Sequence, residues 1–194
     1  LVILEGSGAS IPEVRARAGL ICVPASIGEA VTLYLNPYRL LLADLAVVTM
    51  ADDSAAASTV AAIKAVRPEL DTIQVVFRPT PLADVSGRKA FFCTTAPARV
   101  GKGLQTHLEE VHGVEVVGMS HHLADRSKLR NDISNADTFD VLLVELKAAA
   151  VDVVVRTARE MSRDVVFVNN EPMGTGVTEA FDRLLRVADE RAGR

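Results

Sequence analysis

The 194-residue chain carries a net charge of −4; 49% of its residues are hydrophobic and only 4% are aromatic. A chain of this length can bury the core of one or two compact units. Its mild acidity gives no electrostatic basis for binding nucleic acid, and no apolar run reaches the roughly 18–20 residues of a membrane span. We therefore expect a cytoplasmic globular protein with neither nucleic acid nor membrane as a partner.

Short β-branched runs alternate with longer helical patterns along the whole chain. Strands are predicted at 2–4, 20–23, 45–49, 73–77, 90–94, 114–118, 141–144 and 165–168, and helices at 37–44, 54–66, 98–112, 125–136, 147–161 and 178–192. Continuous apolar strands joined by helical crossovers are typical of parallel sheets that are covered on both faces. The predicted fold class is α/β, with mostly parallel sheets and helices on both faces. Cys22 and Cys93 lie in strand-like runs and are expected to be buried free thiols.

The segment "RPTPLADVSGRK" interrupts this alternation with two Pro and one Gly. Such residues favour turns and mark boundaries between compact parts. We predict the C-terminal portion of a nucleotide-binding α/β domain over 1–78, a linker over 79–88 and a Rossmann-like domain over 89–194. The strand predicted at 2–4 opens the chain without a preceding element, so we expect the chain to be a piece of a longer protein that lacks its N-terminal half.

Glu5 directly follows the first predicted strand and precedes Gly6, Ser7 and Gly8. An acid at a strand end followed by glycines is the usual position of a magnesium-associated carboxylate, because glycines let a phosphate approach the backbone. A strand-ending acid that caps a turn produces the same pattern. No GxxxxGK[ST] phosphate-binding loop occurs in the sequence. Other polar residues at predicted strand ends, where ligands bind in open parallel sheets, are Ser26, Thr49, Asp52, Thr94, Thr95, Ser120, His121, His122, Glu145, Asn169 and Asn170.

Six blocks, in order along the chain, resemble the C-terminal part of cyclic 2,3-diphosphoglycerate synthetases. The blocks are "ILEGSGASIP", "NPYRLLLADLAVVTMADD", "VVFRPTPLADVSGRKAFFCTTAP", "SHHLADRSKLRND", "LLVELKAAAVDVV" and "VFVNNEP…GTGVTEAFDRLL". The resemblance implies an ATP- and magnesium-dependent ligase that closes an intramolecular phosphoanhydride in 2,3-diphosphoglycerate or in another phosphorylated acid. It also implies a P-loop-NTPase-like remnant as the first domain. The family carries its phosphate-binding loop upstream of the segment that matches "LVILEGSG", so we expect this chain to be inactive alone.

The resemblance gives roles to the residues around Glu5. It implies that Glu5 is a catalytic carboxylate that binds Mg²⁺ against the β- and γ-phosphates of ATP. It implies that Gly6, Ser7 and Gly8 approach the transferring phosphoryl group. It further implies that Asp52, or its neighbour Asp53, contacts the base or ribose, although a helix N-cap explains these aspartates equally well.

A substrate with several negative charges requires cations, and the resemblance points to four. Arg39, together with Asn36 at a helix start, is expected to grip a phosphate. Arg126 and Arg130 are four residues apart and share one helix face. Lys147 follows the strand that ends at Glu145. The alternatives are a solvated arginine face paired with nearby aspartates and a Lys147–Glu145 ion pair.

His121 and His122 are expected to bind the substrate. Adjacent residues in an extended chain point to opposite sides, so we do not expect the two imidazoles to share a metal. One is expected to contact a phosphate or to act as acid or base, and the other to bond a backbone carbonyl.

Three functional hypotheses remain open from the sequence. The first is the ligase segment described above. The second is a non-catalytic module that binds an anionic metabolite. The third is a kinase of 2-phosphoglycerate or a dethiobiotin-synthetase-like enzyme. The expected partners are a small phosphorylated acid and either the missing N-terminal half or a second copy of the chain.

Overall fold

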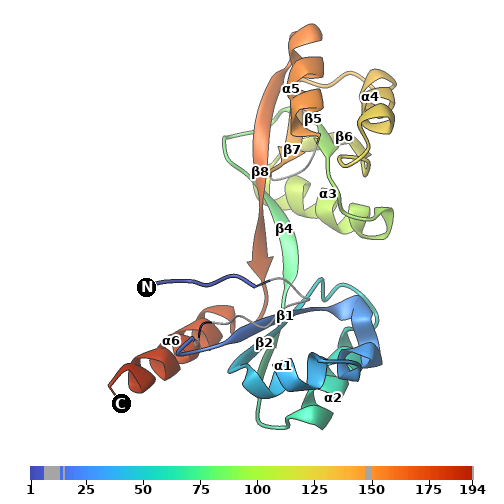
Figure 1. Ribbon diagram of the computed structural model, residues 1–194. Coiled ribbons are helices and arrows are strands. Elements are labelled where there is room, and N and C mark those ends of the chain that lie inside the picture. The colour runs from blue at the N-terminus through green and yellow to red at the C-terminus, as the bar shows by residue number, and fades with distance from the viewer. Residues whose placement is uncertain (7–13, 15, 147–149, 194) are drawn as a thin grey trace. The chain divides into compact units, whose positions relative to one another are not determined.

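A computed structural model describes residues 1–6, 14, 16–146 and 150–193. Contacts divide the chain into two compact units, of which the first comprises residues 1–77 and 172–194 and the second residues 78–171. These boundaries differ from the predicted ones, because the last helix belongs to the first unit and part of the expected linker is strand β4 (Val76–Pro81). The α/β class with parallel sheets is confirmed (Figure 1).

The first unit is built on a three-stranded parallel sheet, in the order β1-β2-β3. Ala46 and Val48 of the central strand point to one face, and Leu45 and Val47 point to the other. Helices η1, α1 and α2 cover the first face, and α6 covers the second. The elements are β1 (Leu20–Pro24), η1 (Ala25–Thr32), α1 (Asn36–Leu42), β2 (Leu45–Thr49), α2 (Ala56–Val66), β3 (Asp71–Gln74) and α6 (Val177–Ala192).

The predicted strand over 2–4 is absent from the structure. Residues 1–6 belong to no strand, and Leu1, Val2 and Ile3 are 97%, 84% and 81% exposed. An apolar run becomes a strand only where a neighbouring strand accepts and donates its backbone hydrogen bonds. Among the described residues, none pairs with this segment in a sheet.

The predicted strand over 73–77 is divided between the two sheets. β3 ends at Gln74 in the first sheet, and β4 begins at Val76 in the second. Val75 lies between them and remains bonded to the first sheet, since its N–H donates to the carbonyl of Val48 at 2.9 Å. One continuous apolar run therefore passes from one unit to the other without a loop.

The second unit is a five-stranded sheet in the order β4-β8-β7-β5-β6. The pairs β5–β6, β5–β7 and β7–β8 are parallel. Helix α3 packs on one face through Leu104 and Leu108, whereas α4 and α5 pack on the other through Leu129, Ile133 and Val153. The remaining bounds are β5 (Lys89–Cys93), α3 (Ala98–His112), β6 (Glu115–Ser120), α4 (Arg126–Ser134), β7 (Val141–Glu145), α5 (Val151–Glu160) and β8 (Asp164–Met173).

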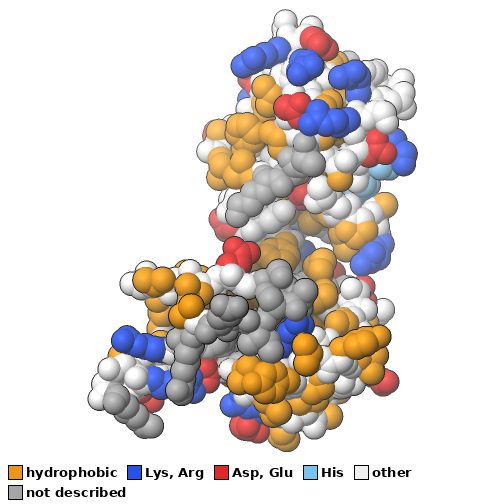
Figure 2. Space-filling view, viewed as in Figure 1, with side chains coloured by type: hydrophobic (Ala, Val, Ile, Leu, Met, Phe, Trp, Pro, Cys, Tyr) orange, Lys and Arg blue, Asp and Glu red, His pale blue; other side chains and the backbone are white. Residues whose placement is uncertain are grey.

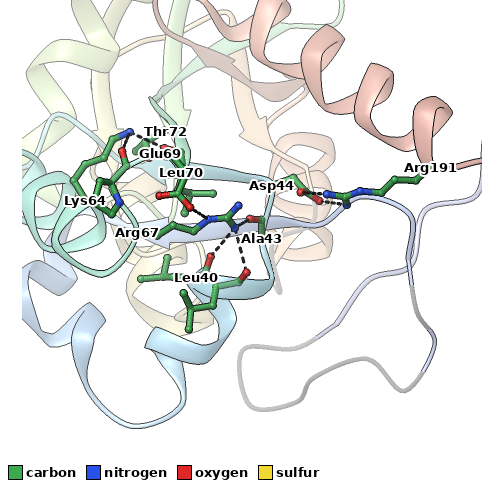
Figure 3. A network of polar contacts seen from close by, with 11 residues as sticks. Leu40, Ala43, Asp44, Lys64, Arg67, Glu69, Leu70, Thr72 and Arg191 are labelled. Carbon is green, nitrogen blue, oxygen red and sulfur yellow. Dashed lines mark hydrogen bonds and ion pairs between the residues drawn. The ribbon is translucent and has the colours of Figure 1, made fainter.

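Two arginines join the helices of the first unit to its sheet (Figure 3). Arg67 follows α2, and its Nη1 donates to the carbonyls of Leu41, at 3.2 Å, and of Ala43 at the end of α1. Arg191 of α6 binds both carboxylate oxygens of Asp44, at 2.8 and 2.7 Å. Asp44 also accepts the N–H of Gly19 at 3.0 Å. Because Gly19 and Asp44 directly precede β1 and β2, this network holds the amino edge of the sheet.

The cysteines differ in exposure although both were expected to be buried. Both thiols are free, but Cys93 is buried and Cys22 is exposed. Cys22 is in register with Val47, on the face that α6 covers, but it lies on the edge strand β1 outside that helix's contacts. The expectation was therefore wrong for Cys22, and burial raises the pKa of the Cys93 thiol far above its usual value.

Hydrophobic side chains gather at the surface over α1 (Figure 2). Leu35, Tyr38, Leu41 and Leu42 are each more than half exposed. The opposite side of α1 carries the fully buried Leu40. Helix α1 is thus apolar on both sides. Within the described ranges, no helix is long and apolar enough to cross a membrane.

Candidate functional site

The second sheet has a topological switch point between β5 and β7. From β5 the chain passes through α3 to β6 on one side, and later reaches β7 on the other side of β5. Helices that leave a sheet in opposite directions open a crevice at the carboxyl ends of the strands between them, and ligands of open α/β sheets bind there. Thr94, Thr95 and Glu145 occupy this point, directly at the ends of β5 and β7.

Glu145 is a buried carboxylate whose two oxygens are both bonded, and its side chain connects the ends of β5 and β7 to a residue within β8. Its Oε1 accepts the hydroxyl of Thr94 at 2.6 Å and the Nδ2 of Asn170 at 3.2 Å. Its Oε2 accepts the N–H and the hydroxyl of Thr95, at 2.9 and 3.0 Å. A carboxylate offers about four lone-pair sites, so Glu145 is saturated by its own unit. It therefore acts as a brace that ties the loop after β5 to β7 and β8.

The brace fixes which atoms its partners present. Because the Thr94 hydroxyl donates to Glu145, it accepts the N–H of Ala96 at 2.9 Å and thereby shapes the loop before α3. Because Nδ2 of Asn170 faces Glu145, its carbonyl oxygen is the group left to accept a bond. The predicted Lys147–Glu145 ion pair cannot be assessed, since Lys147 lies outside the described residues.

His121 is turned toward α3. Its Nδ1 lies 2.7 Å from the carbonyl oxygen of Ala96, and a carbonyl only accepts, so this nitrogen carries the proton. Gly101 of α3 lies against the ring: a Cβ at that position would be 2.9 Å from Cε1 and 3.0 Å from Nε2. The absence of a side chain at residue 101 is what lets His121 pack here.

His122 is turned toward α4. Its Nδ1 lies 2.9 Å from Oδ2 of Asp132, which also accepts the hydroxyl of Ser120 at 2.6 Å. Partial burial raises the pKa of Asp132, but the hydrogen bonds from His122 and Ser120 outweigh it and hold that pKa below its usual value. The two histidines thus diverge as the alternation predicts. Within the described part of the chain, no three potential metal ligands cluster.

The two arginines that were predicted to share one face of α4 make different contacts. Arg126 pairs with Asp152 of α5 at 2.8 Å. Arg130 is exposed and makes no hydrogen bond or ion pair with the described residues. Asp125 instead caps α4, accepting the N–H groups of Ser127 and Lys128. These capping bonds lower the pKa of Asp125 to about 2.

The corresponding edge of the first sheet includes the turn between β2 and α2. Met50 follows β2 in a left-handed conformation, with φ 54°. Oδ1 of Asp53 accepts the N–H of Ala55 at 2.9 Å, in a turn that leads into α2. Asp52 is exposed. The geometry thus gives the turn-forming role to Asp53.

The other predicted site residues of the first unit have different surroundings. Arg39 donates to Oδ1 of Asn36 at 3.1 Å within α1, while its buried Nε has no partner among the described residues. Glu5 and Gly6 are exposed, and Glu5 makes no hydrogen bond with the part of the chain that the structure describes. Ser7 and Gly8 lie outside the described residues.

Sequence reasoning missed the two acids that organise the second edge. Glu145 was predicted at a ligand-facing strand end and as an ion-pair partner of Lys147, but not as the acceptor for the threonines. Asp132 was considered, with Asp125, only as a partner of the two arginines. The available signal was a threonine pair opposite an acid at adjacent strand ends, and an aspartate on the helix that follows Ser120. Sequence alone does not show that these side chains meet, because it does not give the strand order.

Two family models match the chain. Residues 1–76 match the P-loop domain of cyclic 2,3-diphosphoglycerate synthetase, and residues 81–171 match its C-terminal domain. The limits of these matches lie close to the limits of the two units. A P-loop domain binds nucleotides, which agrees with the α/β architecture of the first unit.

Curated relatives carry the same name over most of this chain. The cyclic 2,3-diphosphoglycerate synthetase of Rubrobacter xylanophilus is 42% identical over 194 residues, covering 97% of this chain and 44% of the relative. Those of Thermococcus sibiricus and Methanothermus fervidus are 36% and 40% identical, covering 100% and 89% of this chain and 45% and 39% of each relative. The chain therefore spans less than half the length of these relatives.

Proposed function

Because the chain belongs to the cyclic 2,3-diphosphoglycerate synthetase family, we propose that it supplies the C-terminal part of a ligase that forms cyclic 2,3-diphosphoglycerate from 2,3-diphosphoglycerate and ATP. The observation that carries this proposal is the order of the two matches, P-loop domain first and C-terminal domain second, over 1–76 and 81–171. The substrate, a small phosphorylated acid, comes from the name that the relatives share. The cytoplasm is the compartment we propose.

The proposed reaction has two phosphoryl transfers. A phosphate oxygen of the acid attacks the γ-phosphorus of ATP, the bond to the β-phosphate oxygen breaks, and ADP leaves. An oxygen of the second phosphate then attacks the phosphorus of the substrate's own activated phosphate. The terminal phosphate leaves and the intramolecular phosphoanhydride closes. Such transfers depend on positioning and charge neutralisation more than on covalent help from the protein.

Residues of the first unit are proposed to bind the nucleotide. Glu5 is a suitable Mg²⁺ ligand, because it is an exposed carboxylate without a competing hydrogen bond among the described residues. Mg²⁺ typically needs only one or two protein carboxylates beside substrate phosphates, and it would neutralise phosphate charge there. Gly6, Ser7 and Gly8 are proposed to lie at the transferred phosphoryl group, and Asp52 at the base or ribose.

The phosphorylated acid is proposed to bind cationic and hydrogen-bonding groups. Arg130 offers an exposed guanidinium that no described residue occupies. Arg39, whose Nη1 donates to Asn36, is proposed to bind a phosphate together with that residue. Arg126, Lys147, His121 and His122 complete the proposed set, in which Arg39 and Lys147 act on the transferring phosphoryl group.

The decisive experiment is a turnover assay. The protein, produced with any sequence that its gene encodes upstream of Leu1, is incubated with ATP, Mg²⁺ and 2,3-diphosphoglycerate, and cyclic product and phosphate are measured by ³¹P NMR. We expect both to appear with ADP, and Glu5→Gln to reduce turnover by at least about 100-fold, as loss of a group that stabilises the transition state does. Glu29→Gln, an exposed acid on η1, is the control.

Two results would contradict the proposal at different levels. Consumption of ATP without cyclic product would reject the substrate and leave a kinase or another ligase. Unchanged turnover in Glu5→Gln would return Glu5 to the turn-capping role while leaving the ligase reaction intact.

A further inference from the structure

Ser120, Asp132 and His122 form a connected group at the carboxyl end of β6, which we call the β6 relay. The Ser120 hydroxyl donates to Oδ2 of Asp132 at 2.6 Å, and Nδ1 of His122 lies 2.9 Å from the same oxygen. The backbone N–H of His122 donates to the Ser120 hydroxyl at 3.2 Å. The three residues thus form a closed ring of hydrogen bonds between a strand end and α4.

The relay fixes the tautomer of His122. The hydrogen bonds that lower the pKa of Asp132 keep it ionised at neutral pH, and an ionised carboxylate only accepts. The proton of the short contact must therefore be on Nδ1 of His122. Ser120 strengthens this assignment, because its hydroxyl donates to the same oxygen and accepts from His122. Nε2 is consequently the ring nitrogen of His122 that is left to bond another group.

His122 is the more exposed of the two histidines. Its side chain is 45% exposed, and its Nε2 has no hydrogen bond to the described residues. His121 has the same tautomer but is half-buried, with its ring against Gly101 of α3. Both lie at the carboxyl edge that ends in the switch point. His122 therefore offers the more exposed imidazole.

We propose that His122 binds a phosphate oxygen of the anionic substrate through Nε2, and that Asp132 and Ser120 are positioning residues that hold the imidazole for this contact. With Nδ1 directed at Asp132, a protonated imidazole presents its Nε2–H to the outside, where it donates a charge-assisted hydrogen bond to an anion. The identity of the substrate rests on the proposed function, whereas the tautomer and the contact do not depend on turnover.

The tautomer can be measured directly, because the chain has only four histidines. In ¹⁵N-histidine-labelled protein we expect neutral His122 to be protonated at Nδ1, with its resonances assigned through His122→Gln. Asp132→Asn places an amide that donates to Nδ1, so the proton should move to Nε2, as an aspartate-to-asparagine change does in a catalytic triad. Asp125→Asn, on the same helix but bonded to Ser127 and Lys128, is the matched control and should leave His122 unchanged.

Binding is followed in the same spectra by titration with 2,3-diphosphoglycerate, with glycerate at equal ionic strength as the control. We expect a saturable shift of the His122 resonances with the phosphorylated acid alone. The dissociation constant should rise about tenfold in Asp132→Asn, as expected for one lost charge-assisted hydrogen bond, and less in Ser120→Ala. The melting temperature of each variant separates this loss from unfolding.

The two measurements test the relay and the phosphate contact separately. A proton on Nε2 of His122 in the unaltered protein would overturn the relay, and an equal response to glycerate, or none, would overturn the phosphate contact. A His122 shift that depends on Asp132, in a protein that forms no cyclic product, would support this inference while rejecting the proposed reaction.

Discussion

The carboxyl edges of the two sheets are organised in different ways. In the second unit, buried Glu145 joins the ends of β5 and β7 to β8, and Asp132 joins β6 to α4. In the first unit, Asp53 bonds within its own turn, and the network around Asp44 lies at the amino edge. In the second unit, side-chain bonds thus connect separate elements at the carboxyl edge of the sheet. In the first unit, the network of Asp44, Gly19 and Arg191 connects separate elements at the amino edge.

The largest expected effect comes from removing the brace of the second edge. Glu145→Ala leaves Thr94, Thr95 and Asn170 with donors that have lost their acceptor, and Thr94 is fully buried. We expect the free energy of unfolding to fall by about 3 kcal/mol, measured by urea denaturation with probes in each unit. Glu110→Ala, on the exposed face of α3, should change it by less than about 0.5 kcal/mol. Equal losses would show that the brace contributes nothing.

A pair of glycines in α3 tests the packing of His121 at the same edge. Gly101→Ala and Gly103→Ala gain the same helix propensity, about 1 kcal/mol, but only the first meets the imidazole, since nothing lies within 4 Å of a Cβ at residue 103. Overpacking costs about 1–3 kcal/mol, so Gly101→Ala should be less stable than Gly103→Ala by about 2 kcal/mol. The NMR resonances of His121 should shift in Gly101→Ala and not in Gly103→Ala. Equal stability and equal spectra of the two variants would contradict the contact between residue 101 and His121.

The smallest effect is expected at the amino edge of the first sheet. Partial burial raises the pKa of Asp44, but bonds from Arg191 and Gly19 outweigh it and lower that pKa overall. Asp44→Asn should lose about 1 kcal/mol at neutral pH, because Arg191 is half exposed. The exposed Asp182→Asn of α6 is the control.

The pH dependence has a definite sign. An aspartate whose pKa is lowered by folding stabilises the folded state above its unfolded pKa of about 3.9. This contribution disappears as the pH falls through the lower, folded value. The difference between the unaltered protein and Asp44→Asn should therefore close in acid, and a difference that persists there would rule out the ion pair.

Periodicity predicted most of the helices and strands, because local apolar spacing determines which face an element buries. Strand 45–49 and helix 98–112 match β2 and α3 residue for residue. The run at 2–4 has the same apolar character but no strand partner in the structure, and pairing is not a local property. The last helix follows the β8 strand in sequence, yet packs on Leu45 and Ile73 in the first unit.

The candidate site was predictable in its position but not in its bonding. Rules for parallel sheets place Thr94, His122 and Glu145 at one edge, because each follows a predicted strand. Which acid meets which donor depends on the strand order β7-β5-β6 and on the turn before α4. The arginines illustrate this limit: helical spacing placed Arg126 and Arg130 on one face, but the packing of α5 gave Asp152 to Arg126 alone.

The return of α6 to the first unit has a consequence for synthesis on the ribosome. All residues of the second unit, 78–171, emerge before the helix that completes the first. Until then Leu45, Val47 and Ile73 lack the cover that Val177, Ala180 and Leu184 provide. The unit whose chain begins first is thus finished last, and its nascent sheet exposes an apolar face that a chaperone can bind while the inserted unit folds.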